Sequence, residues 1–148
     1  MTLGSSILPA LLLLWAGIVI GGSLIVAPAK FTVDQLTLAT ALEVGRAQFR
    51  WVAIAELLLS AGIVAAALLG NPARLIWCAL PIAIFALQWL ALMPALDERT
   101  ARIIADQPVG DSSLHLIYVV AEITKCAFLL LAAVMLARGM VISTGQDR

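Results

Sequence analysis

The stretch LHLIYVVAEITKCAFLLLAAVMLA, residues 114–137, decides the fold because it is long and apolar enough to cross a bilayer yet carries two charges in its interior. A helix rises about 1.5 Å per residue, so Lys125 would lie roughly 16 Å from the start of the stretch, near the middle of a hydrocarbon layer about 30 Å thick. A charge at that depth costs about 2.5 to 3.5 kcal/mol on insertion scales. This cost indicates that Glu122 and Lys125 have partners inside a helical bundle.

Helical spacing places the polar residues of this stretch on one face. His115, Tyr118, Glu122 and Lys125 follow one another at intervals of three, four and three residues, so they fall within a stripe about 100° wide. One interpretation is structural, because Glu122 and Lys125 can neutralise each other on the same helix. The other is functional, because ionisable residues inside a membrane commonly face a bundle interior or a wet cavity and mark ligand sites.

Composition places the whole chain in the membrane class. Hydrophobic residues make up 63% of the 148 residues, charged residues only 12%, and the mean hydropathy is +1.07. Soluble domains have about 45 to 50% apolar and 25% charged residues. The sequence therefore predicts an all-α, multi-pass integral protein of the cell inner (plasma) membrane, folded as an antiparallel up-down bundle of four transmembrane helices. We expect one domain, residues 1–148, with spans at about residues 5–27, 47–69, 75–96 and 114–137.

Local signals set the ends of these spans. Pro28 lacks an amide hydrogen and is expected to end the first helix. Thr32 and Gln35 have the spacing of a capping box, which predicts that the next helix begins near Val33. The segment Gly70–Arg74 is rich in turn-forming residues, so the second and third spans are expected to be antiparallel neighbours. The tail after Arg138 is expected to fray.

The predicted topology brings polar residues to one side of the membrane. The start of the second span, the end of the third and the start of the fourth share that side, whereas the opposite side offers almost no charged residue besides Arg74 and Arg138. We therefore expect a polar cleft open to one side, and we expect it to bind a ligand. Its candidate ligand-binding residues are Arg46, Arg50, Glu56, Gln88, Arg99, His115, Tyr118, Glu122 and Lys125.

Several chemistries find no support in the sequence. The net charge is zero with no basic run, so we expect no nucleic-acid partner. One histidine, without a nearby cysteine or an HxxxH pattern, predicts no metal site, and we expect no cofactor. Cys78 and Cys126 lie inside predicted spans and are interpreted as small buried apolar residues. No catalytic residue can be assigned.

Short motifs resemble known membrane families. Residues 21–31, residues 92–99, and Leu114-His115 with Tyr118 and Glu122 look like a group of small bacterial four-helix inner-membrane proteins of unknown function, similar in layout to the transmembrane-protein-205-like families. This resemblance implies a fold and no activity. Residues 98–102, ERTAR, also resemble the ER-x-x-R element of the four-helix glutathione and eicosanoid membrane enzymes. In that family the element lies near the second span, whereas here it follows the third.

Three functional hypotheses follow. The first is a membrane protein whose cleft binds or conducts a small anionic or amphipathic ligand. The second is an accessory or assembly subunit of a larger membrane complex or a homo-oligomer, docked through Gly17 and Gly21, whose GxxxG spacing allows close helix packing. The third is an intramembrane enzyme that acts on a lipid-soluble substrate, with His115 or Glu122 as acid or base.

Overall fold

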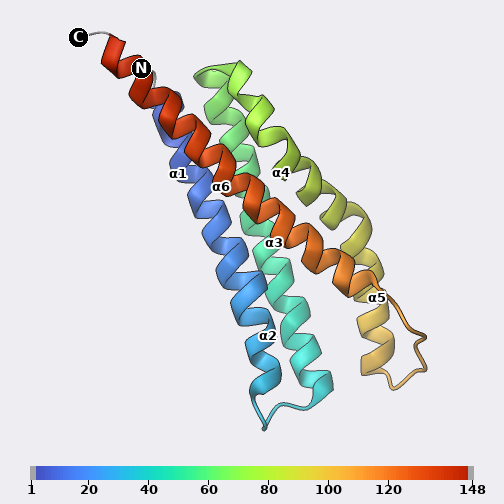
Figure 1. Cartoon of the computed structure of the whole chain (residues 1–148). Helices are drawn as coiled ribbons and strands as arrows, with labels where there is room; N and C mark the ends of the chain where they lie inside the picture. The colour runs from blue at the N-terminus through green and yellow to red at the C-terminus, as the bar shows by residue number, and fades with distance from the viewer. Residues whose placement is uncertain (1–2, 147–148) are drawn as a thin grey trace.

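The computed structural model describes the backbone of residues 3–146 and the side chains of residues 7–139 (Figure 1). Its described residues form four helical stretches that are long and apolar enough to cross a membrane, namely Ile7–Thr32, Leu38–Leu69, Pro72–Ile104 and Leu114–Gly139. No strand occurs within residues 3–146. The predicted all-helical class with four candidate spans is therefore confirmed.

The first stretch consists of α1 (Leu3–Ile18), the π-helical η1 (Val19–Val26), α2 (Ala27–Ala29) and the short η2 (Lys30–Thr32). The prediction that Pro28 ends this helix is wrong. In η1 the turns are wider, and the Ala27 N–H donates to the Gly22 carbonyl five residues back. This wider turn relieves the clash that the Pro28 ring would make with the carbonyl four residues back in a regular α-helix.

The second stretch, α3 (Leu38–Leu69), begins later than predicted. The Thr37 hydroxyl accepts a hydrogen bond from the Thr40 N–H and caps the helix. The capping box expected at Thr32 does not form, because its hydroxyl donates to the Ala29 carbonyl and Val33 is extended. Threonine hydroxyls readily bond to nearby backbone groups. Here the Thr32 hydroxyl is engaged with the preceding turn and cannot cap a helix that follows it.

The second half of the chain begins with the expected turn, in which the Asn71 side chain accepts from the Ala73 N–H. A second π-helical segment precedes Pro94, as the first precedes Pro28. The last helix extends to Gln146, beyond the point where fraying was expected. The elements are η3 (Pro72–Arg74), α4 (Leu75–Leu87), η4 (Gln88–Leu92), α5 (Met93–Ile104) and α6 (Leu114–Gln146).

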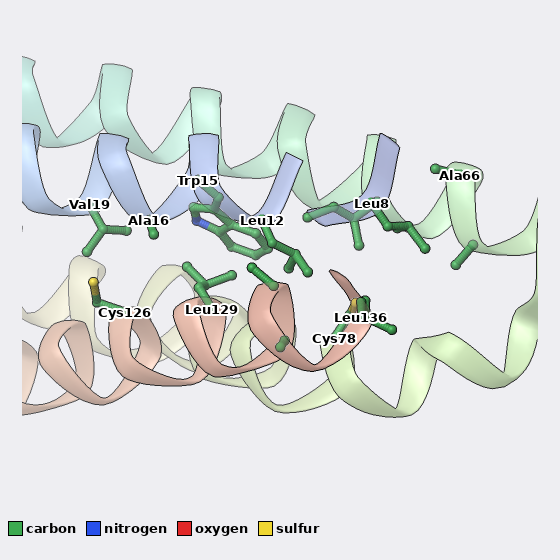
Figure 2. Close-up of a cluster of buried hydrophobic side chains, with 14 of the residues drawn as sticks. Leu8, Leu12, Trp15, Ala16, Val19, Ala66, Cys78, Cys126, Leu129 and Leu136 are labelled. Carbon is green, nitrogen blue, oxygen red and sulfur yellow. The ribbon is translucent and has the colours of Figure 1, made fainter. Parts of the chain in front are cut away.

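The apolar core fills one end of the bundle. α1 packs against both α3 and α6, and α4 packs against α6. The start of α1, the end of α6 and the turn at residues 70–74 lie at one end, and the connections at residues 33–37 and 105–113 lie at the other (Figure 1). Figure 2 shows this core between α1 and α6. Its members include Leu8, Leu12, Trp15, Leu129 and Leu136. The core includes Trp15 and Phe85, which also contact the buried polar residues described below.

Candidate functional site

Lys125 lies at the centre of a buried polar cluster. Its side chain has no exposed surface, and its Nζ lies 2.6 Å from Glu56 Oε1 and 3.1 Å from Glu122 Oε2. It also donates a hydrogen bond to Gln88 Oε1 at 2.8 Å. Three oxygens therefore surround the ammonium, two from carboxylates and one from an amide. The three acceptors come from α3, α6 and η4, and Lys125 thereby ties three stretches of the chain together.

Glu56 receives a second donor from the first helix. The Trp15 indole N–H donates to Glu56 Oε1 at 2.7 Å, and the Trp15 ring meets Phe85 edge to face with 6.0 Å between centroids. Phe85 in turn lies 5.7 Å from Lys125 Nζ. We call Lys125, Glu56, Glu122, Gln88 and Trp15 the Lys125 cluster. All four helical stretches contribute to it.

Glu122 is the incompletely satisfied member of the Lys125 cluster. It is 1% exposed, and among the described side chains neither of its carboxylate oxygens has a hydrogen-bond partner. The 3.1 Å contact with Lys125 is an ion pair without the geometry of a hydrogen bond. A buried carboxylate left in this state costs free energy, so a native fold that retains one calls for an explanation.

Glu122 also forms the inner wall of a cavity. This cavity has a volume of about 350 Å³ and lies at the end of the bundle opposite the apolar core. Most of its wall is apolar, and it is built from the end of the first stretch, the first half of α3, α5 and the start of α6. The lining residues are Ser23, Leu24, Ala27, Pro28, Lys30, Phe31, Leu42, Gly45, Arg46, Phe49, Met93, Leu96, Asp97, Thr100, His115, Tyr118, Val119 and Glu122.

Charged side chains stand at the outer end of the cavity. Arg46 and Asp97 form an ion pair at 3.4 Å between α3 and α5, with about two fifths of each side chain exposed. Lys30 lies over the rings of Phe31 and Phe49, with its Nζ 5.2 and 5.4 Å from their centroids. Cation–π contacts of this kind hold an ammonium without neutralising it.

The structure places the predicted site residues in two adjoining groups. Glu56, Gln88, Glu122 and Lys125 meet in the Lys125 cluster. The helical spacing on α6 brings His115 and Tyr118 into the cavity wall beside Glu122, and Arg46 joins them from α3. Ser60, one helical turn after Glu56, is buried but donates to the Leu57 carbonyl of its own helix.

Two of the predicted residues lie outside both the cavity and the Lys125 cluster. Arg50 is exposed on α3 and is absent from the cavity wall. Arg99 lines a separate shallow groove at the junction of α5 and the following loop. A π-helix has more residues per turn than an α-helix, so η4 rotates everything beyond Gln88 away from the direction that a regular projection predicts.

The prediction omitted residues that the cavity and the cluster use. Trp15 lies in the first predicted span and hydropathy treats it as apolar, although a buried indole N–H needs a hydrogen-bond acceptor. Lys30 lies beyond the expected end of the first span, whereas Ser23 lies within that span, where nothing in the sequence indicated that its hydroxyl would face a cavity. Among the described residues, no three His, Cys, Asp or Glu side chains lie close enough together to hold a metal ion.

Comparison with known proteins gave no match, since no protein-family model, no curated protein and no solved structure corresponds to this chain. The similarity to the transmembrane-protein-205-like layout therefore stays a prediction. The geometry of the cavity and of the Lys125 cluster carries the functional argument.

Proposed function

We propose that the chain spans the cell inner membrane as an antiparallel four-helix bundle and that its one-sided cavity binds a small amphipathic or anionic ligand. The outer surface supports the membrane setting, because large apolar side chains are exposed on every candidate span, among them Leu14, Leu58, Leu90 and Leu116. Such a surface needs lipid around it. The polar interior supports the ligand, because charged side chains inside a membrane mark binding sites and pathways.

One observation carries the proposal. Among the described residues, the buried side-chain atoms without a hydrogen-bond partner are Ser23 Oγ and the two carboxylate oxygens of Glu122, and both residues line the same cavity. Protein interiors satisfy most buried polar atoms. Unsatisfied atoms collected in the wall of one cavity are therefore best explained by a bound molecule that supplies the missing partners.

Titration of the protein in lipid nanodiscs tests the proposal. The probes are octanoate, octylamine and the ω-amino acid of the same chain length, and empty nanodiscs give the blank. We expect at least one probe to bind saturably with one site per chain by calorimetry. Val119→Phe, which fills the cavity, should abolish binding, and Val120→Phe, on the exposed neighbouring position, should retain it. Binding that Val119→Phe leaves unchanged, or no probe binding above the blank, overturns the proposal.

A second candidate function is that of a subunit in a larger membrane assembly. A Cβ added at Gly17 or Gly21 would meet no atom within 4 Å, so no other part of the described chain covers this GxxxG motif. Small residues at this spacing let helices of separate chains approach closely. Mass measurement after gentle solubilisation tests the idea. If the measured mass is that of one chain, and Gly17→Leu does not change it, this function is excluded.

A further inference from the structure

We infer that the ligand of the cavity is dipolar, with an ammonium group at the Glu122 end, an anionic group at the Lys30 end and a short apolar body between them. This inference rests on the proposed function and adds the chemical class of the ligand. It follows from three features of the cavity wall: the charge of the inner end, the charge of the outer end and the apolar surface that separates them.

The inner end has an excess of negative groups. The Lys125 cluster contains two carboxylates and one ammonium, so its formal charge is −1. Glu56 has both Lys125 and Trp15 as donors, whereas Glu122 has the Tyr118 hydroxyl and the Lys125 ammonium beside it but no donor in hydrogen-bond geometry. A buried uncompensated charge is strongly destabilising, and a cation is the ligand group that removes it. An ammonium also has several N–H donors, enough for Glu122 and for the unpartnered Ser23 hydroxyl.

The outer end has an excess cation. The ion pair with Asp97 compensates Arg46, but the described contacts of Lys30 are with aromatic rings and include no carboxylate. Gly45 permits this position, because a Cβ added there would lie 2.5 Å from Lys30 Nζ. Lys30 is therefore held against α3 in the cavity wall, where it can bind a carboxylate or phosphate.

The wall between the two ends is apolar. It includes Leu24, Leu42, Met93, Leu96 and Val119, which offer no polar group to a ligand. His115 near the outer end and Glu122 at the inner end are seven residues apart on α6, so the ends are separated by about 10 Å along the helix axis. A short alkyl or aryl body fits this surface, since burying it stabilises the complex in proportion to its apolar area.

The order of affinities of matched probes tests the inference. In nanodiscs we expect octylamine to bind at least about tenfold more tightly than octanol, because a charge-assisted hydrogen bond is stronger than a neutral one. The ω-amino acid of the same chain length should bind more tightly again. Glu122→Gln should remove the preference for octylamine over octanol. Lys30→Met should reduce the ω-amino acid to the level of octylamine, and Arg50→Gln, outside the cavity, should leave every affinity unchanged.

Two further variants keep the test decisive. Gly45→Ala keeps the charge of Lys30 but displaces its ammonium, and it should weaken the ω-amino acid as Lys30→Met does. If Glu122→Gln fails to fold, Ser23→Ala should still lower the preference for the amine. Octanoate binding as tightly as octylamine would overturn the dipolar ligand while the proposed function stands. The absence of binding by every probe, as expected for a cavity that holds only water, would overturn both.

Discussion

Lys125 tolerates complete burial because three oxygens surround its ammonium. Those of Glu56 and Gln88 come from other stretches of the chain, and the third comes from Glu122, its ion-pair partner on the same helix. Such a group is stable only as a complete set. A buried ion pair and a pair of apolar residues can be equally stable, but half of a buried pair is strongly destabilising. The Lys125 cluster is therefore more sensitive to the loss of one member than to the loss of all of its charges.

Lys125→Met should consequently destabilise the bundle by about 3 to 5 kcal/mol, because it leaves the carboxylates of Glu56 and Glu122 buried without a cation. Combining it with Glu56→Gln and Glu122→Gln should restore most of this loss. Thermal unfolding in detergent measures both variants. A triple variant less stable than the single one would contradict the account.

Trp15→Phe should destabilise the fold by about 1 to 3 kcal/mol, because the Glu56 carboxylate loses the indole N–H at 2.7 Å while the ring contact with Phe85 is retained. Trp51→Phe is the matched control, since Trp51 is 71% exposed. The same unfolding measurement should show little change for it. Equal effects of the two substitutions would show that the Trp15 hydrogen bond contributes nothing.

At the residue scale the sequence predicted much of this site. Glu56, Gln88, Glu122 and Lys125 were expected together because polar residues inside apolar spans seek one another, and the structure brings them into contact. Trp15 was not expected, since hydropathy counts the indole as apolar and ignores its N–H. The projection also failed for Arg99, because no sequence signal measures how far η4 rotates α5.

At the scale of single elements, the two π-helical segments have a common cause. η1 and η4 each end two residues before a proline, Pro28 or Pro94, and in each the residue after the segment donates to a carbonyl five residues back. A missing N–H and a bulky ring favour this wider turn. Both segments serve the site, because η1 supplies Ser23 to the cavity and η4 supplies Gln88 to Lys125.

Neighbouring glycines of η1 should respond in opposite ways to alanine. Gly22→Ala would place a Cβ 2.8 Å from Cγ2 of Val52, whose short branched side chain cannot swing away, so we expect a loss of about 1 to 3 kcal/mol. Gly21→Ala meets no atom within 4 Å and should be neutral or slightly stabilising. Unfolding midpoints of the two variants measure the difference. Equal midpoints would contradict the close approach of Gly22 in η1 to Val52 in α3.

At the scale of the whole molecule, the distribution of basic residues predicts an orientation. Five basic residues lie in or beside the connections at residues 33–37 and 105–113, whereas Arg74 and Arg138 lie toward the other end. The five are Lys30, Arg46, Arg50, Arg99 and Arg102. The positive-inside rule then places these connections in the cytoplasm and the two chain termini outside. The cavity would accordingly open toward the cytoplasm.

Reporter fusions at the C-terminus test this orientation. A reporter that is active only outside the cytoplasm should give a signal, and one that is active only inside should not. The reverse pattern would indicate that Lys30 and Arg46 are placed for the ligand rather than by the topology rule.

The four-helix architecture was predictable because apolar length is a strong signal. The cavity was harder to predict from the sequence, because its volume depends on how η1 and α5 pack.

The contacts of Lys125 also determine how the bundle is assembled. A rod covered with leucine and alanine can slide along its neighbour in lipid at little cost, because each shift exchanges one methyl contact for another. A displacement of α6 by one residue, about 1.5 Å, would instead break the Glu56 and Gln88 contacts of Lys125 together. The contacts of the ammonium thereby select one vertical register of α6 from many alternatives of nearly equal energy.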